Sequence, residues 1–345
     1  MGLSRACRIF LIWICTGALF LACAKPSVRT IVVPQRSDAG AKHRPGKAKT
    51  ILVFMPGTPQ ADSVWDGMRS ELSSEFDVVA ERFEKEGSVD TIGDAIRKIS
   101  PACVVLMNNS TVRLYRQYQN AKRSSTDFPP AVIIMTSFAQ QTAKSIKNAT
   151  GISYEVPAVI QFVKLRSIVE SPVGKVGVVY RSQFAEFFGA QRDLARREQI
   201  ELVGKELKGE PAKGDVEAAL KSLLEQDRID ALWVLNDNRL LSPQMITSDC
   251  LPVLKGTTRV PVIVGVPTLL GKSYPVGTFA MLPDHTALGV QTANLIFDLA
   301  DNDFKLGGRK VDLPISIKTV VDVQEVRQRF GLKQGGLDAV DQTVQ

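Results

Sequence analysis

Histidine is almost absent from this chain of 345 residues, which contains only His43 and His285. Nucleophilic catalysis by serine or cysteine usually needs an adjacent base, most often histidine, and many zinc sites need histidine ligands. The sequence also lacks a G-x-S-x-G turn and a G-x-G-x-x-G segment, which removes the usual signs of a serine hydrolase or a dinucleotide-binding enzyme. We therefore expect no catalytic residue, no cofactor and no metal site, and the chain is not predicted to be an enzyme.

A phosphate-binding loop is missing as well. Gly271-Lys272-Ser273 matches the end of such a loop, but the pattern requires a glycine at position 266, where Val266 stands. The motif also belongs directly after a first strand, and this segment lies late in the chain. We do not interpret it as a nucleotide site.

Cysteine is scarce, and its five positions show no metal-ligand spacing. Cys7 and Cys15 lie in an N-terminal apolar segment, and Cys23 directly follows that segment. Cys103 lies within an apolar run and Cys250 lies near a proline. We expect the last two to be buried or unpaired thiols.

Long hydrophobic runs are rare, and the one at the N-terminus, residues 9–22, is only 14 residues long. A membrane span needs about 20 residues, whereas a shorter run behind Arg5 and Arg8 is typical of a signal peptide. Phe20-Leu21-Ala22-Cys23 resembles a bacterial lipobox, so we predict a signal peptide at 1–23 and lipidation of Cys23. Ordinary secretion by cleavage at the A-x-A pattern of Ala22-Cys23-Ala24 is the alternative. Both predict export, and lipidation would anchor the protein to a membrane at the periplasmic or outer surface.

Residues 24–48 form a basic segment rich in proline, glycine and alanine. Seven cations stand between Lys25 and Lys49, against the single acid Asp38. Such a segment is typical of a flexible tether near anionic lipid headgroups. A nucleic-acid-binding tail is the alternative, but export argues against it, so no nucleic-acid partner is expected. Loss of Arg5 and Arg8 with the signal lowers the net charge from +7 to +5, and the basic segment carries this remaining excess, so the folded part is close to neutral.

Short β-branched runs alternate with helical patterns from residue 50 onward, which is typical of parallel sheets covered by helices. Val64, Met68 and Leu72 recur at helical spacing, as do Val216 and Leu220. The predicted strands are 50–55, 76–80, 102–107, 131–135, 175–180, 200–203, 231–235 and 260–264.

The strand spacing occurs twice. The end of the first strand and the end of the third are 52 residues apart in one half (Met55 to Met107) and 55 in the other (Tyr180 to Leu235). The fourth strand ends 28 residues further on in the first half and 29 in the second. Two matched copies predict an α/β protein made of two doubly wound, parallel-sheet lobes with a central cleft.

Ligands of open parallel sheets bind beyond the carboxyl ends of the strands. Polar and aromatic residues at those ends are therefore the candidate ligand-binding residues, although asparagine, aspartate and serine also cap helices there without any ligand. The candidates are Thr58, Gln60, Asn109, Ser110, Thr136, Ser137, Tyr154, Tyr180, Phe184, Asp237, Asn238 and Pro267.

Several segments carry a resemblance to a known family: Asn148-Ala149-Thr150-Gly151-Ile152-Ser153, Pro157, Gln161, Val176-Gly177-Val178-Val179-Tyr180, Asp215-Val216-Glu217-Ala218-Ala219-Leu220, Asp230-Ala231-Leu232-Trp233-Val234, Asp237-Asn238 and Leu288-Gly289-Val290-Gln291-Thr292-Ala293. Through these residues the region 49–332 resembles the ABC-transporter substrate-binding proteins of the type I periplasmic-binding fold, in the branch of tryptophan- and tyrosine-type amino-acid binders. The resemblance implies a ligand held in the cleft and delivered to an ABC-type permease.

The resemblance also implies three crossings between the lobes, near 151–155, 282–284 and 313–315, after which a strand and helix at 315–330 return to the second lobe. The expected domains are then lobe 1 at 49–151 plus 283–313 and lobe 2 at 152–282 plus 314–333, with a C-terminal tail at 334–345. A Cys103–Cys250 disulfide would join the two lobes and oppose their motion. We expect a monomer.

Asp237 is the candidate for a charged contact, because a carboxylate there could pair with a ligand ammonium. Tyr154, Tyr180 and Phe184 could form an aromatic wall, and hydroxyl donors such as Ser110 could meet a carboxylate. This set suits a small zwitterion such as an amino acid. The structural alternatives are a helix N-cap for Asp237 and a core position for Phe184. A ligand-sensing domain and an envelope structural or assembly protein with a degenerate cleft are the alternative functions.

Overall fold

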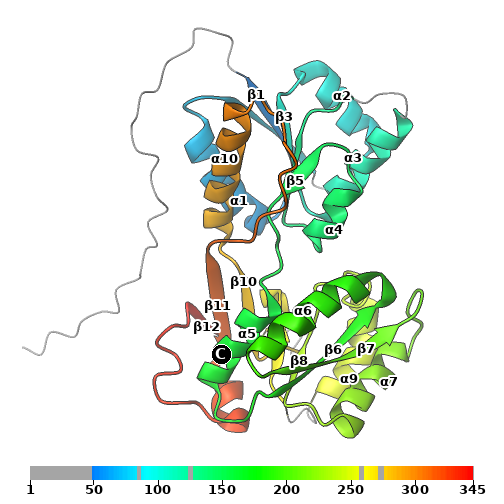
Figure 1. Cartoon of the computed structure of the whole chain (residues 1–345), viewed down its shortest axis with the longest axis vertical. Coiled ribbons are helices and arrows are strands. Elements are labelled where there is room, and N and C mark those ends of the chain that lie inside the picture. The colour runs from blue at the N-terminus through cyan, green and yellow to red at the C-terminus, as the bar shows by residue number, and fades with distance from the viewer. Residues whose placement is uncertain (1–48, 84–86, 123–126, 256–259, 271–275, 345) are drawn as a thin grey trace, which may run out of the picture. The chain divides into compact units, whose positions relative to one another are not determined.

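The computed structural model describes residues 49–344 except 84–86, 123–126, 256–259 and 271–275. Two β-sheets organise this region, each covered by helices on both faces, and we call the two halves lobe 1 and lobe 2 (Figure 1). This confirms the predicted α/β class with two parallel-sheet lobes. The predicted signal peptide, the lipidated Cys23 and the basic tether lie outside the described residues.

Lobe 1 contains a five-stranded sheet in the order β2-β1-β3-β4-β5, in which every neighbouring pair is parallel. The residues of β3 are all buried, as expected for a strand covered on both faces. The strands are β1 (Thr50–Pro56), β2 (Asp77–Phe83), β3 (Cys103–Met107), β4 (Ala131–Ile134) and β5 (Ala149–Gly151).

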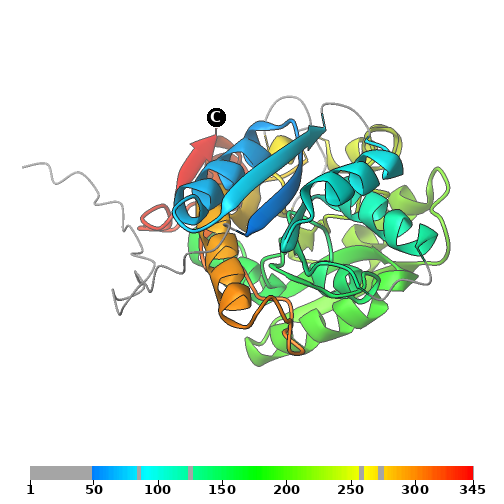
Figure 2. The ribbon, with the colours of Figure 1, turned by 90° about the horizontal axis from the view of Figure 1, so that it is seen from above.

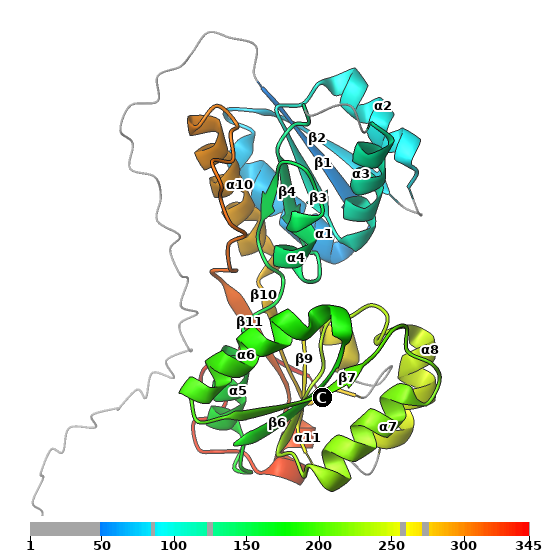
Figure 3. The same ribbon diagram turned by 45° about the vertical axis from the view of Figure 1, so that its right-hand side comes forward.

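Alternating residues of β1 supply the two cores of lobe 1. Ile51 and Val53 pack toward α1 and α10, while Leu52 and Phe54 pack toward α2 and α3. Helices α1 and α10 lie side by side on one face (Figure 2), and α2 and α3 cover the other (Figure 3). The helices are α1 (Pro59–Leu72), α2 (Val89–Ile99), α3 (Asn109–Ala121), α4 (Ala139–Lys144) and α10 (His285–Asp301).

Lobe 2 contains a seven-stranded sheet in the order β12-β11-β10-β9-β8-β6-β7. Only the pair β10 and β11 is antiparallel among its described strands. The region 334–345, expected as a tail, contributes the edge strand β12 beside β11. The strands are β6 (Lys175–Arg181), β7 (Glu201–Leu207), β8 (Ala231–Trp233), β9 (Val262–Val264), β10 (Phe279–Pro283), β11 (Ile317–Asp322) and β12 (Gln342–Val344).

The helices of lobe 2 also form two layers. Phe162 of α5 and Phe188 of α6 belong to one core cluster, and Leu220 of α7 belongs to the other. The helical segments are α5 (Ala158–Ile168), η1 (Ser182–Phe184), α6 (Ala185–Arg197), α7 (Asp215–Lys221), η2 (Ser222–Gln226), α8 (Pro243–Met245), η3 (Ile246–Cys250), α9 (Leu251–Leu254), η4 (Pro267–Leu269), α11 (Val323–Glu325) and η5 (Val326–Phe330).

The chain passes between the lobes in three segments: after β5, between β10 and α10, and before β11. Backbone hydrogen bonds join them. Ser153 donates its N–H to the carbonyl of Asp312 (2.8 Å), and Asp312 donates to the carbonyl of Gly151 (2.9 Å). Asp284 donates to the carbonyl of Ser316 (3.0 Å). These are the three places that the resemblance implied.

No helix within residues 49–344, outside the four internal gaps, is long and apolar enough to cross a bilayer. The described cysteines, Cys103 in lobe 1 and Cys250 in lobe 2, are both buried and free. Burial raises the pKa of each thiol to about 12, so both stay protonated and unreactive at neutral pH.

Candidate ligand-binding site

A cavity of about 530 Å³ is lined by residues from both lobes. Its walls come from the first residues after β3 and β4 in lobe 1 and from the ends of β6 and β8 in lobe 2. These are carboxyl ends of parallel strands, where open sheets hold their ligands. Five of the predicted ligand-binding residues line the cavity: Asn109, Ser137, Phe184, Asp237 and Asn238.

The wall from lobe 1 is built on a pair of strand ends. Asn109 Nδ2 donates to Ser137 Oγ (3.2 Å), and Ser137 donates its N–H to Asn109 Oδ1 (3.1 Å). Asn108 caps α3 by accepting the N–H groups of Ser110 and Thr111, each at 3.0 Å. These contacts fix the two loops relative to each other, so the cavity has a preformed wall on this side.

An aromatic contact joins the lobes beside the cavity. The rings of Phe138 and Phe184 stack with centroids 3.7 Å apart and planes at 20°. Phe138 has a positive φ of 53°, which a bulky residue rarely adopts. Its N–H donates to Glu155 Oε1 at 2.7 Å, and this bond holds the strained residue in place.

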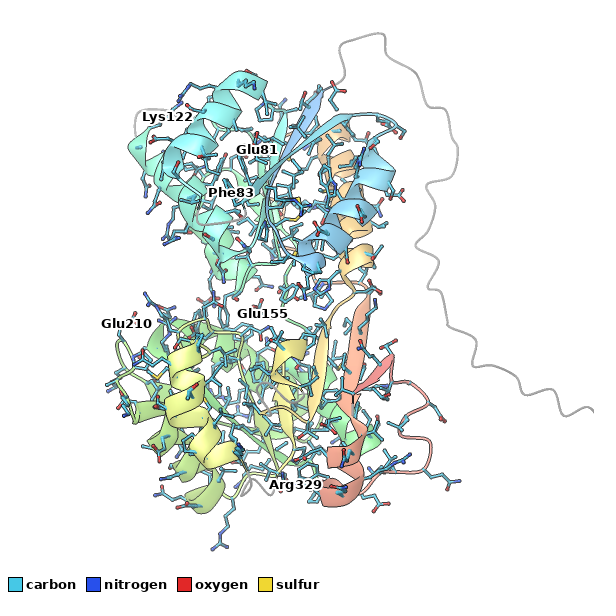
Figure 4. All side chains as sticks on the ribbon, turned by 180° about the vertical axis from the view of Figure 1, so that it is seen from behind. Glu81, Phe83, Lys122, Glu155, Glu210 and Arg329 are labelled. Atoms are coloured by element: carbon cyan, nitrogen blue, oxygen red, sulfur yellow. The ribbon has the colours of Figure 1, made fainter. Side chains whose placement is uncertain are left out.

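Glu155 lies in the first connecting segment (Figure 4). Its Oε2 accepts the hydroxyl of Ser153 at 3.1 Å. Burial raises the pKa of the Glu155 carboxyl, while the hydrogen bonds from Phe138 and Ser153 oppose that rise. The carboxyl therefore links a connecting segment to the backbone of a residue that lines the cavity.

Arg181 and Asp237 form an ion pair in the wall from lobe 2. Arg181 Nε and Nη2 donate to the two carboxylate oxygens of Asp237 at 2.6 and 2.8 Å. Asp237 Oδ1 also accepts the N–H of Arg239 at 2.9 Å. The Asp237 carboxylate, which is 2% exposed, thus already has three donors within the chain. The predicted pairing of this carboxylate with a ligand ammonium is therefore replaced by pairing with Arg181.

Four predicted residues from lobe 1 lie outside the cavity lining. Thr58 caps α1, where its hydroxyl accepts the N–H of Ala61 (3.3 Å), and Gln60 is exposed on the same helix. Thr136 is fully buried and donates to the carbonyl of Ile134 (3.1 Å). Ser110 lies at the start of α3 without lining the cavity.

Three further predicted residues also lie elsewhere. Tyr154 Oη and His285 Nε2 are 2.9 Å apart, so this pair joins the first connecting segment to the start of α10. Burial raises the pKa of Tyr154 to about 12 and lowers the pKa of His285, which keeps both groups neutral at pH 7. The side chain of Tyr180 does not line the cavity. Its ring stacks on the ring of Phe188, with centroids 4.4 Å apart. Pro267 begins η4 and does not line the cavity.

The sequence analysis did not assign the cationic residues of the cavity. Arg113 and Arg116 reach it from α3, and Arg181 and Arg239 reach it from lobe 2. Asn109, Arg113 and Arg116 are spaced i, i+4 and i+7, which places them on one helix face. Two arginines at this spacing after an asparagine at a strand end would have allowed the sequence to predict cationic side chains at the cavity.

Two buried amide oxygens at the cavity have no hydrogen-bond partner. They are Oε1 of Gln141 in lobe 1 and Oδ1 of Asn236 in lobe 2, and both residues line the cavity. A buried polar atom without a partner is costly, which points to a ligand or water as the missing donor. In the described part of the chain, no cluster of three metal-ligating side chains occurs.

No protein-family model matches the sequence, and no curated protein matches it. Solved structures do match: an ABC domain in complex with L-Trp from Streptococcus pneumonia has 17% identity and a TM-score of 0.57, and the match covers 86% of this chain and 100% of that one. A substrate-binding protein with adhesive properties from Clostridium difficile, in a ligand-free open form, has 15% identity and a TM-score of 0.57, with 86% and 99% covered. A conserved domain protein from Vibrio cholerae has 18% identity, a TM-score of 0.55, and 86% and 100% covered.

At these identities the likeness is one of fold. The described chain has the type I periplasmic-binding fold of ABC-transporter substrate-binding proteins, as the resemblance implied.

Proposed function

We propose that this protein is an exported solute-binding lipoprotein that captures a small molecule between its two lobes and delivers it to an ABC-type permease. The cavity of about 530 Å³ carries the proposal, because both lobes line it at the carboxyl ends of their strands. A ligand that contacts both walls would favour the arrangement in which the lobes are close.

The cellular location is part of the proposal. The positive residues, the apolar run 9–22 and Cys23 suit export and a lipid anchor, and the basic residues 24–48 would then form the tether. Lobe 1 at 49–151 plus 283–313 and lobe 2 at 152–282 plus 314–333 would be the folded domains, with the edge strand β12 added to lobe 2. A single copy of the chain is proposed as the binding unit.

An amino acid fits the groups that line the cavity. Its carboxylate would meet an arginine, and its ammonium would donate to the partnerless oxygens of Gln141 and Asn236 rather than to Asp237. The L-Trp-bound neighbour supports this class of ligand without fixing the side chain. The stacked phenyl rings of Phe138 and Phe184 add an apolar surface to the cavity.

A melting-temperature screen tests the proposal. The protein is unfolded, dialysed and refolded to remove carried ligand, and each of the twenty amino acids is then added. We expect at least one to raise the melting temperature with concentration, as binding to the folded state requires. Calorimetry should then give one site per chain, and X-ray scattering should give a smaller radius of gyration at saturation.

Transport is tested separately. A strain without the protein should lose uptake of the bound solute, and expression of the intact protein should restore it. Binding without any effect on uptake would favour a sensing role. The absence of any stabilising small molecule would contradict solute binding and favour a structural role.

A further inference from the structure

The cavity carries an excess of positive charge. Four arginines line it, Arg113, Arg116, Arg181 and Arg239, whereas Asp237 is the one carboxylate among the lining residues of the described chain. Lobe 1 contributes two of the cations and no acid. The charged side chains that line the cavity from α3 are therefore all cationic, beside Asn109 and Val112.

Pairing within lobe 2 removes little of this excess. Asp237 neutralises Arg181 through two short hydrogen bonds. Glu210 lies 3.6 Å from Arg181 Nη1 and 3.7 Å from Arg239 Nε, but its side chain is 70% exposed (Figure 4). Exposed pairs of this kind contribute little, because water screens them. Among the described residues Arg116 forms no ion pair with an acid, so its charge adds to the weakly paired charge of Arg239.

The cations come from both sides of the cavity. Arg116 lines the cavity from α3 of lobe 1. Arg239 follows β8 in lobe 2. Guanidinium groups bind carboxylate or phosphate oxygens through paired hydrogen bonds, and these bonds strengthen as water is excluded. An anion between the walls would link the lobes.

The two amide oxygens without a hydrogen-bond partner place a second requirement on the ligand. Oε1 of Gln141 and Oδ1 of Asn236 are buried and have no hydrogen-bond partner in the chain. The backbone of Gly265 lies close under Asn236, since a Cβ added at Gly265 would come within 2.3 Å of Asn236 Nδ2. The close packing holds the Asn236 amide beside Gly265, directly after β9, so a ligand or a water in the cavity has to supply the missing contact.

We propose that the ligand is a small organic acid with a net negative charge and at least one hydroxyl or ammonium donor, such as an acidic amino acid or a hydroxy diacid. Its acid groups contact Arg116 and Arg239, and its donor contacts Gln141 or Asn236. This inference rests on the proposed solute-binding function and restricts its substrate class.

Matched pairs of probes test the charge requirement. The refolded protein is titrated with L-glutamate and L-glutamine, with L-aspartate and L-asparagine, and with L-malate and its diamide, while inorganic phosphate tests a bare anion. We expect an acid to bind at least about tenfold more tightly than its amide, and to bind more weakly as salt rises from 50 to 500 mM.

Arg116→Gln and Arg239→Gln should each weaken binding of the acid about tenfold or more. Arg97→Gln is the matched control, because Arg97 is an exposed arginine of lobe 1 that pairs with Asp94 and does not line the cavity. Phosphate binding as tight as that of the organic acids would contradict the need for a donor. Equal binding of an amide, or unchanged binding by both arginine variants, would overturn the charge requirement while leaving solute binding intact. If none of these probes binds but another amino acid of the melting-temperature screen does, only the charge requirement fails, and if nothing in either screen binds, both proposals fail.

Discussion

The guanidinium of Arg181 and the carboxylate of Asp237 are held together by two hydrogen bonds, at 2.6 and 2.8 Å, at the ends of the neighbouring strands β6 and β8. Both side chains are nearly buried, at 10% and 2% exposure. The Arg181 guanidinium also lies 5.4 Å from the centre of the Phe184 ring. Asp237, which was predicted to pair with a ligand ammonium, thus pairs instead with an arginine in the wall of the cavity.

Asp237→Asn should destabilise the protein, because it leaves the Arg181 charge buried without its partner. Breaking one side of a buried pair costs about 3 kcal/mol or more. The free energy of unfolding in urea measures this loss. The double variant Arg181→Met, Asp237→Asn removes the unpaired charge and should recover part of the stability. If the two single losses simply add in the double variant, the pair does not act as a unit.

Alanine substitutions at two helical glycines are expected to change the stability in opposite directions. In α10, a Cβ added at Gly289 would lie 2.1 Å from the carbonyl oxygen of Val64, so the two helices must separate. Overpacking of this kind costs about 1–3 kcal/mol. In α6, a Cβ at Gly189 would meet nothing within 4 Å. Gly189→Ala should therefore stabilise by about 0.5–1 kcal/mol through helix propensity. Melting curves of both variants should shift in opposite directions, and equal shifts would contradict the helix contact.

Most of the buried strands were predictable from sequence because local pattern and tertiary environment agree, but the buried strand β10 was not among the predicted strands. All eight predicted strands exist, and β3 differs from its predicted range by one residue. The predicted strand 200–203 instead spans Glu201–Leu207, because its half-exposed edge position allows polar residues that hide the pattern. The strand β12 was not predictable, since the short polar segment Gln342–Val344 becomes a strand only by pairing with β11, far away in the sequence.

The site was predictable to the level of loops but not of side chains. Strand ends located Asn109, Ser137 and Asp237 because parallel strands end on one edge. The partners of those side chains depend on orientation across the sheet. Tyr180 and Arg181 are neighbours in β6, yet successive side chains face opposite ways, and Arg181 is the one that reaches the cavity.

Processing at Cys23 gives a prediction about location. If the cysteine is lipidated, Cys23→Ala should move the protein from the membrane fraction to the soluble fraction, and globomycin should cause the unprocessed form to accumulate. Fractionation and mass spectrometry of the N-terminus measure both. A mature protein that begins at Lys25 and is processed normally in globomycin would show ordinary secretion instead.

The final prediction concerns the pH dependence of stability at Glu155. Burial raises the pKa of this carboxyl in the folded state above its usual value of 4.5. The folded protein therefore favours the protonated form, and the stabilisation that results is present at low pH and is lost as pH rises through the folded pKa. Glu155→Gln keeps an acceptor for the N–H of Phe138 and cannot ionise. We expect this variant to gain stability relative to the natural protein as pH rises from about 4.5 to 8.

Melting temperatures of the two proteins across that pH range measure the effect. The pKa of His285 is lowered by burial, so its protonation in the unfolded state reduces stability as pH falls below about 6.5. His285 is present in both Glu155→Gln and the natural protein, so its effect cancels when the melting temperature of one is subtracted from that of the other. Glu71→Gln, at an exposed position of α1, is the control and should show no such gain. A constant difference between Glu155→Gln and the natural protein would mean that Glu155 does not change its charge in this range. A difference that grows with pH would show that the carboxyl joining the connecting segment to Phe138 sets the stability of this part of the site.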